Sequence, residues 1–596
     1  MKKTDKIKFK TDWDLSQLYK SEKDPQIEKD MLDMEKAFDS FALKYKDRTD
    51  YQEKADTLFE AISNYESIFK DRALSRPYLY FYYRKDINSK DSEAERRLNL
   101  LTERYAKNDN KVLFFNLKIS KIKEEKREEF LRSEKLAPYR YFLKCAFDSG
   151  KHMLSELEEK ILSLKSNPSY SLWIQGLEKQ ESKLTVEWKK KILPISEAIG
   201  IAPDLSMKER HALYDKVMEK LKTISDFAES EINAVIINKK IDDELRGFTK
   251  PYSATILGYQ NKEKTVLDLV NIVTKNFRIS QKFYKLKAKI LKLPSLLYID
   301  RSAPIGKTKK EIPFEEAVKI VRNAFEKVNP IYSETLDSFL QNGQIDVYPK
   351  AGKQGGAYCS SSPNSPTFVL LNHTPKFRSV MTLAHEMGHA IHAKLSSENQ
   401  PTLYKDHTIS TAEVASTLFE NLVFDEVFSL LTPEEQIVAL HNKISDDMAT
   451  IFRQIACFNF EVDLHTNIRL KGSLQKEEMS KLMNKHMSSY LGPVVKMRES
   501  DGYFFVTWSH IRRFFYVYSY AFGGLVSRAL YASYKKDKTF EKSIRTFLSA
   551  GGSKSPEEIF LDAGIDVTKP EFFELGLRSI EEDIIRLEKM TKKSKK

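Results

Sequence analysis

The sequence predicts a mainly α-helical protein with one small β-element. The chain has 596 residues but only 20 Gly and 20 Pro, and Lys, Glu, Leu and Ala are abundant, which favours helices. Its hydrophobic fraction of 41% and charged fraction of 31% are typical of a well-packed globular chain and exclude a collagen-like or mostly disordered one. Only residues 345–372 combine β-branched and aromatic residues with Gly, Ser and Pro clusters.

Helical periodicity and helix breakers predict two regions. Residues 26–165 are charged and helix-periodic, and a cluster of Pro and Gly follows at 168–203. Such a cluster is typical of a boundary between structural regions. We therefore predict an N-terminal helical lobe at 1–195 and a second region at 196–596.

Within the β-element we expect strands at 345–348, 357–360 and 367–371. The segment 293–313, with its three prolines, is expected to form loop and a short strand. No other stretch of the chain has a strong β pattern.

The basic charge does not indicate a nucleic-acid partner. Lys and Arg exceed Asp and Glu by 98 − 85 = 13, but the lysine runs at 189–191, 307–310 and 592–596 are short and lack interleaved aromatic residues. Stacking aromatics would be needed for single-strand binding. We expect these lysines to be solvated surface residues.

The sequence predicts a cytoplasmic location. Its lysine-rich start is followed by no apolar core of a secretory signal, and no stretch reaches the roughly 18 apolar residues of a membrane span. The three cysteines, Cys145, Cys359 and Cys457, are far apart and odd in number, which favours a reducing compartment. No membrane partner is expected.

The most informative segment is VMTLAHEMGHAIHAKL at 380–395, which contains His385, Glu386 and His389 as an HExxH pattern. On a helix, residues four apart lie on one face, so both imidazoles can bind one metal ion. Glu386 is then placed to act as a general base.

The rest of this helix has an amphipathic pattern. At 100° per residue the two histidines fall opposite an apolar stripe, so the helix can bury its back and present the histidines to a cleft. The stripe consists of Val380, Leu383, Ala384, Met387, Ile391 and Leu395.

A hydrolytic zinc site usually has three protein ligands. The metzincin pattern is excluded, because it requires Gly and His where the chain has His392 and Leu395. Spacing leaves His407 and Glu413 as candidates for the third ligand. His392 is expected to pack or to meet solvent.

Glu413 begins a predicted helix that carries Glu420 on the same face, where Glu420 can orient a ligand imidazole. Alternatively, Glu413 caps the start of this helix and binds no metal, because Ser410 and Glu413 have the spacing of a capping box.

Several motifs together resemble the M3 family of zinc metallopeptidases, and the oligoendopeptidase F branch most. The motifs are WDLSQLY, GGAYCSSS before TFVLLN, TLAHEMGHAIH, AEVAST and SHIRRFFYVYSYAFG, and they span essentially the whole chain. The resemblance implies a two-lobed helical ellipsoid with the metal deep in a central channel. It also implies one Zn²⁺ per chain, with Glu413 as the third ligand, and oligopeptides as substrates.

The resemblance further implies that a histidine and tyrosines at 509–523 bind the scissile carbonyl. The matching residues are His510, Tyr516 and Tyr520, although the residues after the histidine depart from the family's pattern and Tyr518 competes for a role. Tyr516 and Tyr520, four apart, would share a helical face. Read without the family, this stretch is an aromatic-rich core segment.

By the same resemblance, an edge strand at 367–371 would pair with an extended substrate by β-addition. Cys359, just before it, is expected to be a small buried residue and no ligand.

The sequence thus predicts a zinc-dependent endopeptidase that hydrolyses internal bonds of short oligopeptides. Two alternatives stay open. One is a zinc exopeptidase, although the GAMEN-type strand of such aminopeptidases is missing at Gly356-Ala357-Tyr358. The other is a basic, non-catalytic binding protein.

Overall fold

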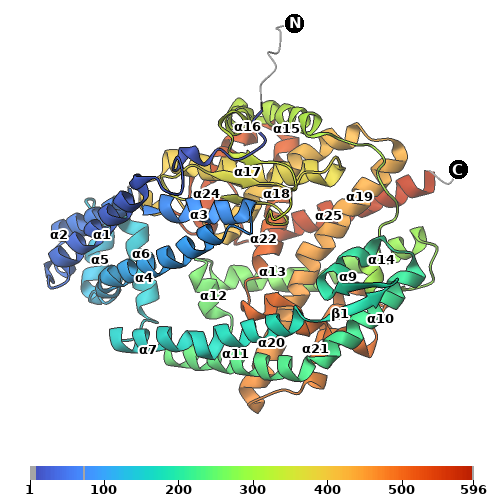
Figure 1. The fold of residues 1–596 in the computed structure, drawn as a ribbon, viewed down its shortest axis with the longest axis horizontal. Coiled ribbons are helices and arrows are strands. Elements are labelled where there is room, and N and C mark those ends of the chain that lie inside the picture. The colour runs from blue at the N-terminus through green and yellow to red at the C-terminus, as the bar shows by residue number, and fades with distance from the viewer. Residues whose placement is uncertain (1–8, 71–73, 594–596) are drawn as a thin grey trace, which may run out of the picture. The chain divides into compact units, whose positions relative to one another are not determined.

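The computed structural model describes residues 9–70 and 74–593 (Figure 1). Residues 1–8, part of the segment on which the prediction of no secretory signal rests, and 594–596, the end of the last lysine run, lie outside this range. The chain folds into two compact units. Unit 1 is 1–156, 310–429 and 530–565; unit 2 is 157–309, 430–529 and 566–596.

Unit 1 contains helices from three separate stretches of the chain. They are α1 (Pro25–Tyr45), α2 (Ala55–Lys70), α3 (Arg76–Ile87), α4 (Ser92–Ser120), α5 (Glu124–Arg132), α6 (Arg140–Gly150), α15 (Phe314–Val328), α16 (Pro330–Asn342), α17 (Phe377–Asn399), α18 (Ile409–Ser429), α23 (Glu541–Ser549) and α24 (Pro556–Asp562). Its strands are β4 (Ile345–Asp346), β5 (Tyr358–Ser360) and β6 (Phe368–Leu370).

Unit 2 is also mainly helical. Its helices are α7 (Glu156–Ser166, from residue 157), α8 (Leu172–Glu181), α9 (Ile195–Ile201), α10 (Met207–Thr223), α11 (Ser225–Leu245), α12 (Ser253–Gly258), α13 (Glu263–Lys275), α14 (Phe277–Ile290), α19 (Pro433–Asp447), α20 (Arg453–Lys471), α21 (Lys476–Leu491), α25 (Pro570–Lys593) and the first part of α22 (Tyr518–Lys536). Its strands are β1 (Thr185–Trp188), β2 (Lys191–Pro194), β3 (Leu296–Leu297) and β7 (Val495–Lys496).

The mainly helical fold class is confirmed, and the two-lobed shape with a channel stays a prediction.

The compact units differ from the two regions predicted with a boundary at residue 195. Residues 157–195 belong to unit 2, while 310–429 and 530–565 join the N-terminal helices in unit 1. Helix breakers mark turns in the chain, whereas the units are formed by packing between distant segments.

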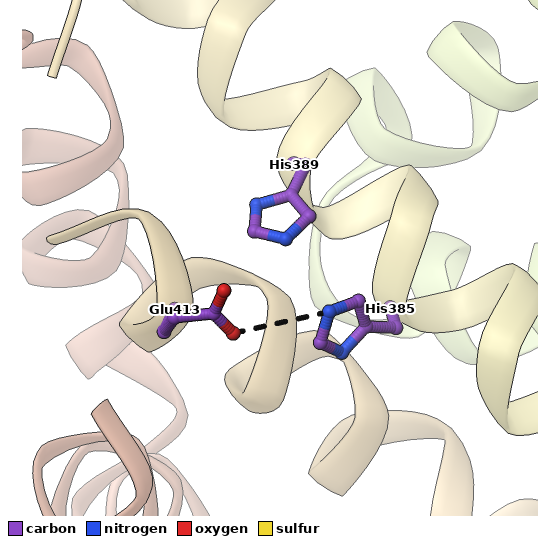
Figure 2. Close-up of side chains that lie close together, drawn as sticks. All are labelled: His385, His389 and Glu413. Atoms are coloured by element: carbon purple, nitrogen blue, oxygen red, sulfur yellow. Dashed lines mark ion pairs between the residues drawn. The ribbon is translucent and has the colours of Figure 1, made fainter. Parts of the chain in front are cut away.

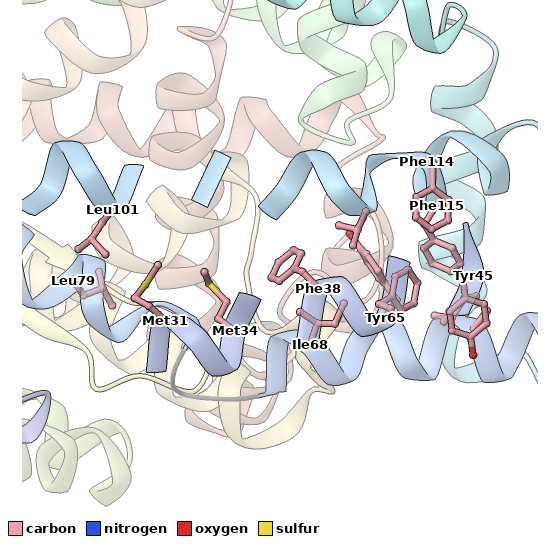
Figure 3. Packing of buried hydrophobic residues seen from close by; sticks show 14 of the residues in the cluster. Met31, Met34, Phe38, Tyr45, Tyr65, Ile68, Leu79, Leu101, Phe114 and Phe115 are labelled. Atoms are coloured by element: carbon pink, nitrogen blue, oxygen red, sulfur yellow. The ribbon is translucent and has the colours of Figure 1, made fainter. Parts of the chain in front are cut away.

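The core of unit 1 shows such long-range packing. Aromatic and aliphatic side chains of α1, α2 and α4 meet in one buried cluster (Figure 3); the ring centroids of Phe41 and Phe115, for example, lie 5.0 Å apart. Phe368 and Leu370 of β6 belong to the same cluster. The N-terminal helices therefore support the sheet beside the HExxH helix.

The predicted β-element is a three-stranded sheet with the strand order β4-β6-β5. β6 pairs in parallel with β4 and antiparallel with β5, and the indole Nε1 of Trp13 donates to the carbonyl of Val369 at 2.8 Å. The prediction of an edge strand at 367–371 is therefore wrong: β6 is central because its three residues are fully buried and apolar. The outer strand is β5.

A hairpin that the sequence patterns did not predict lies in unit 2. β1 and β2 pair antiparallel around a two-residue turn, Lys189 and Lys190, whose φ angles are +48° and +63°. Two-residue hairpin turns usually carry Asn or Gly at such positions. Because this turn has two lysines instead, the sequence lacks the residues that normally indicate a hairpin. The predicted short strand near residue 296 is confirmed as β3, which pairs with β7.

Among the described residues, no helix is long and apolar enough to cross a lipid bilayer.

Candidate metal centre and associated groups

The HExxH motif lies on α17 as predicted. All six residues of the apolar stripe are at most 3% exposed, while His385 and His389 are only partly buried. The stripe fixes α17 in the core of unit 1 and leaves both imidazoles on its accessible side.

Helix α18 packs closely along α17 (Figure 1), because both helices carry small residues where they cross. A Cβ on Gly388 would lie 2.8 Å from the Cα of Ser416 and 3.2 Å from the carbonyl oxygen of Ala415. Gly388 sits inside HExxH, and Ala415 and Ser416 belong to AEVAST. The two motifs thus bring the backbones close enough for a side chain of α18 to reach the histidines.

That side chain is Glu413. Donor atoms of His385, His389 and Glu413 all lie within 4.8 Å of one another (Figure 2), and His385 Nε2 is 3.9 Å from a carboxylate oxygen of Glu413. Helix α18 begins at Ile409, so Ser410 lies inside it. The capping-box alternative for Glu413 is therefore excluded.

The other candidate ligand, His407, is used elsewhere. Its ring stacks on that of His392 at 3.9 Å, and His392, 1% exposed, also packs against Phe547. The expectation that His392 packs is confirmed. Burial lowers the pKa of His407 to about 4, so this pair is neutral near pH 7.

Glu420 contacts the far nitrogen of His385, Nδ1. A carboxylate there accepts the proton of Nδ1, so Nε2, on the side of Glu413, is the nitrogen that would bind a metal after losing its own proton. Burial alone would lower the pKa of His385, but the hydrogen bond and charge of Glu420 raise it to about 9. Two imidazoles and one carboxylate with converging lone pairs fit a divalent cation such as Zn²⁺.

Glu386 is 6% exposed beside these donors. Burial raises the pKa of its carboxyl group to about 7, the charge of His385 opposes this rise, and the backbone N–H of Cys359 donates a hydrogen bond to it. A carboxyl group with a pKa near 7 is suited to general acid–base chemistry. Cys359 itself was expected to be a small buried residue and is half-buried instead; it lies on the outer strand β5.

The predicted C-terminal residues form a second cluster, which lies in unit 2. His510 Nδ1 contacts the hydroxyl of Tyr516, and the ring of Tyr520 lies 5.9 Å from His510 and 5.8 Å from Tyr516. Tyr518 is fully buried, and its hydroxyl donates to Asn261 at 3.0 Å.

The predicted shared helical face of Tyr516 and Tyr520 is wrong. Tyr516 precedes α22, which begins at Tyr518. Phe514 and Phe515 have φ angles of +50° and +62°, a conformation rare for bulky residues. This turn, rather than a helix, brings the two tyrosines together.

Two buried carboxylates that the sequence patterns did not indicate hold this segment. Glu461 accepts the N–H of Phe515 at 2.8 Å. Glu231 binds Arg512, whose Nη1 donates to the carbonyls of Phe505 and Trp508. No local motif marks either residue; a charged residue on the apolar face of a predicted helix was the available signal.

Comparison with known proteins gives consistent matches. Residues 206–579 match the model of peptidase family M3, and 118–175 match that of Oligopeptidase F. The chain is 24% identical to the oligopeptidase PepF of Bacillus subtilis (strain 168) over 565 residues, 93% of this chain and 83% of that protein. It is 26% identical to an oligoendopeptidase F homolog of Borreliella burgdorferi, covering 94% of each chain.

Two crystal structures share the fold. A protein from Chlamydophila abortus has a TM-score of 0.84 at 23% identity and covers 97% of this chain and 98% of its own. Oligoendopeptidase-F from Enterococcus faecium has a TM-score of 0.71 at 18% identity and covers 95% and 99%. Because the family model matches more than half of this chain, the chain belongs to peptidase family M3.

Proposed function

We propose that the protein is a zinc-dependent endopeptidase that hydrolyses internal peptide bonds of short oligopeptides. The observation that carries the proposal is the convergence of His385, His389 and Glu413 beside the buried Glu386. Zinc bound there would supply Lewis-acid chemistry, polarising the substrate carbonyl and making a water more acidic. The relatives named oligopeptidase and oligoendopeptidase F support the substrate class.

Glu386 is the proposed general base. Its carboxylate takes a proton from the attacking water as the C–O bond forms, and it returns that proton to the amine nitrogen as the C–N bond breaks. Its pKa of about 7 suits both transfers. Glu420 holds His385 in one tautomer throughout.

His510 and Tyr516 are the proposed donors to the carbonyl oxygen of the scissile bond. Burial lowers the pKa of His510 to about 4, so the ring is neutral at pH 7 and donates through one nitrogen only. In the unbound site the Tyr516 hydroxyl is in hydrogen-bond contact with His510 Nδ1. On substrate binding the hydroxyl would turn from Nδ1 to the carbonyl oxygen, so that the O–H of Tyr516 and the single N–H of His510 both donate there. Tyr520, whose ring packs against both, is proposed to complete the pocket.

We propose β5, in place of β6, as the strand that pairs with the substrate backbone. Among the described strands β5 pairs with β6 alone, so its other edge can add an extended peptide. All three of its residues are partly exposed.

A cytoplasmic location is also proposed. The three cysteines are free and widely separated in the sequence, which favours a reducing compartment.

The test is a short, internally quenched peptide, blocked at both ends, incubated with the purified protein. We expect internal cleavage that a chelator abolishes and added zinc restores. Cleavage of unblocked peptides only would indicate an exopeptidase. No cleavage of any peptide, with zinc bound one to one, would refute the proposed activity.

A further inference from the structure

A row of aromatic rings and guanidinium groups leads away from His510 within unit 2. The ring centroids of His510 and Trp508 lie 6.1 Å apart, and the Arg453 guanidinium lies 4.5 Å from the Trp508 ring centre. Phe504 follows; the guanidinium groups of Arg453 and Arg301 lie 5.7 Å and 5.9 Å from its ring centre. We call these residues, with Tyr298 at the far end, the Arg–aromatic row.

Neither guanidinium of the row has a carboxylate partner among the described residues. Arg301 stacks 3.8 Å from the centre of the Tyr298 ring, and its Nη1 donates to the Tyr298 carbonyl at 2.9 Å. The buried Nε of Arg453 has no hydrogen-bond partner within the described chain, and neither has the hydroxyl of Tyr298, a residue that is 1% exposed. Arg301, Arg453 and Phe504 are all partly exposed.

The nearby carboxylates are already engaged. Asp300 accepts from Arg210 and His211, each at 2.8 Å, and Asp501 accepts the backbone N–H of Arg498 at 2.7 Å. The buried Lys287 donates through Nζ to the carbonyl of Arg301; burial and the nearby arginines lower its pKa to about 7, so it carries only part of a positive charge near pH 7. The charge of Asp501 also acts on Arg301, but neither Arg301 nor Arg453 forms an ion pair with a described carboxylate, so both guanidinium groups keep donors for a ligand.

We propose that Arg301 and Arg453 bind a carboxylate group of the substrate on the C-terminal side of the scissile bond. The proposal rests on the function proposed above, because it takes His510 as the group that meets the scissile carbonyl. Planar guanidinium groups held against aromatic rings are pre-oriented to bind a carboxylate through two parallel hydrogen bonds. Every free peptide has such a group at its C-terminus, and the positive N-terminus would be repelled.

The dimensions limit the length of the bound segment. Arg453 is two ring contacts away from His510, of 6.1 Å and 4.5 Å, and an extended peptide advances by about 3.3–3.6 Å per residue. A carboxylate at Arg453 therefore lies within about three residues of the carbonyl at His510, and one at Arg301 lies further along. The protein would thus prefer peptides that end soon after the cleaved bond.

The experiment compares kcat/KM for matched peptides. One pair differs only in a C-terminal free acid or amide and has neutral side chains; a second pair is amidated and carries Glu or Gln at the third position after the cleaved bond. We expect the acidic peptide of at least one pair to be preferred about 10- to 100-fold. The pair that shows the preference identifies the source of the carboxylate.

The variants Arg453→Gln and Arg301→Gln should lower this ratio toward one. Arg278→Gln removes the same charge from an exposed position of α14 and should keep the wild-type ratio. Arg453→Lys, which keeps the charge without the two-pronged donor, should have an intermediate ratio and serves if the Gln variants do not fold.

Equal kcat/KM for acidic and neutral peptides in the wild-type protein would overturn the carboxylate subsite and leave the peptidase function intact. So would an unchanged preference in folded Arg453 and Arg301 variants. Failure to cleave any of the four peptides would instead refute the proposed function itself.

Discussion

Adjacent residues of α17 differ in their preferred charge state because their surroundings differ. His385 contacts the carboxylate of Glu420, which raises its pKa against the effect of burial, whereas burial dominates at Glu386 and raises the pKa of this acid. His389, without a carboxylate contact of that kind, has its pKa lowered well below the usual value by burial. The proposed base and the two proposed metal ligands therefore differ in pKa because of their local contacts, although they lie within five residues of one helix.

Replacing Glu386 with Gln should leave the metal ligands in place and remove the base. Gln keeps the size of the side chain but cannot accept the proton of the attacking water, so kcat should fall by about 10²- to 10⁴-fold. Steady-state kinetics and zinc content measured on the same preparation test this. Normal turnover in the zinc-loaded variant would contradict the role of Glu386.

Tyr516 and Tyr518 form a matched pair for a hydroxyl-deletion test. Tyr516→Phe should lower kcat by about 10²- to 10³-fold, as the loss of one oxyanion donor does. Tyr518→Phe removes a buried hydroxyl bonded to Asn261, so it should cost about 1 kcal/mol of unfolding free energy and leave kcat nearly unchanged. The reverse pattern would assign the carbonyl contact to Tyr518.

At the scale of elements, the metal site depends on how closely α17 and α18 approach. The histidines come from one helix and Glu413 from the other, and the helices meet where Gly388 faces Ser416 and Ala415. A side chain at residue 388 would push the helices apart, and the donor atoms would separate with them. The placement of Tyr516 likewise depends on a contact with another helix. The side chain of the buried Glu461 accepts the N–H of Phe515 and so stabilises the turn at Phe514 and Phe515.

We expect Gly388→Ala to destabilise the protein by about 1–3 kcal/mol through overpacking and to weaken zinc binding. Gly200→Ala is the control: this glycine lies in α9 with nothing within 4 Å of an added Cβ, so Ala should be neutral or slightly stabilising. Thermal unfolding and zinc titration of both variants decide the matter. Unaltered zinc affinity in Gly388→Ala would show that the spacing of α17 and α18 does not control the site.

For the whole molecule, buried neutral histidines make stability depend on pH. His441 in unit 2 is 1% exposed and packs against Phe283, and burial lowers its pKa to about 3. The unfolded chain, in which a histidine has its usual pKa near 6.5, binds the proton first as the pH falls. Stability is therefore retained above pH 6.5 and lost as the pH falls below it.

His441→Phe should remove this part of the acid sensitivity. Between pH 7.5 and 5.5 the wild-type protein should lose about 1.4 kcal/mol more unfolding free energy than the variant. Urea unfolding of both proteins at the two pH values gives the difference. Equal losses would mean that His441 is protonated in the folded state or does not affect stability.

The sequence by itself predicted the elements whose chemistry is local. The HExxH spacing and apolar stripe depend on residues within one helix, so they identified His385, Glu386 and His389 and the buried face of α17. The strands near 345, 358 and 368 also followed from local composition. Glu413 and Glu420 needed the periodicity of a second helix, which favoured Glu413 over His407, and the family resemblance strengthened that choice.

Only the tertiary structure decided what depends on distant contacts. Whether a strand is central or outer depends on its partners, so β6 was misplaced at the edge; the turn before Tyr516 depends on Glu461 on another helix. The compact units combine segments hundreds of residues apart, and the Arg–aromatic row joins Arg301 to Phe504. These features come from burial and packing between distant segments, which no local pattern of residues encodes.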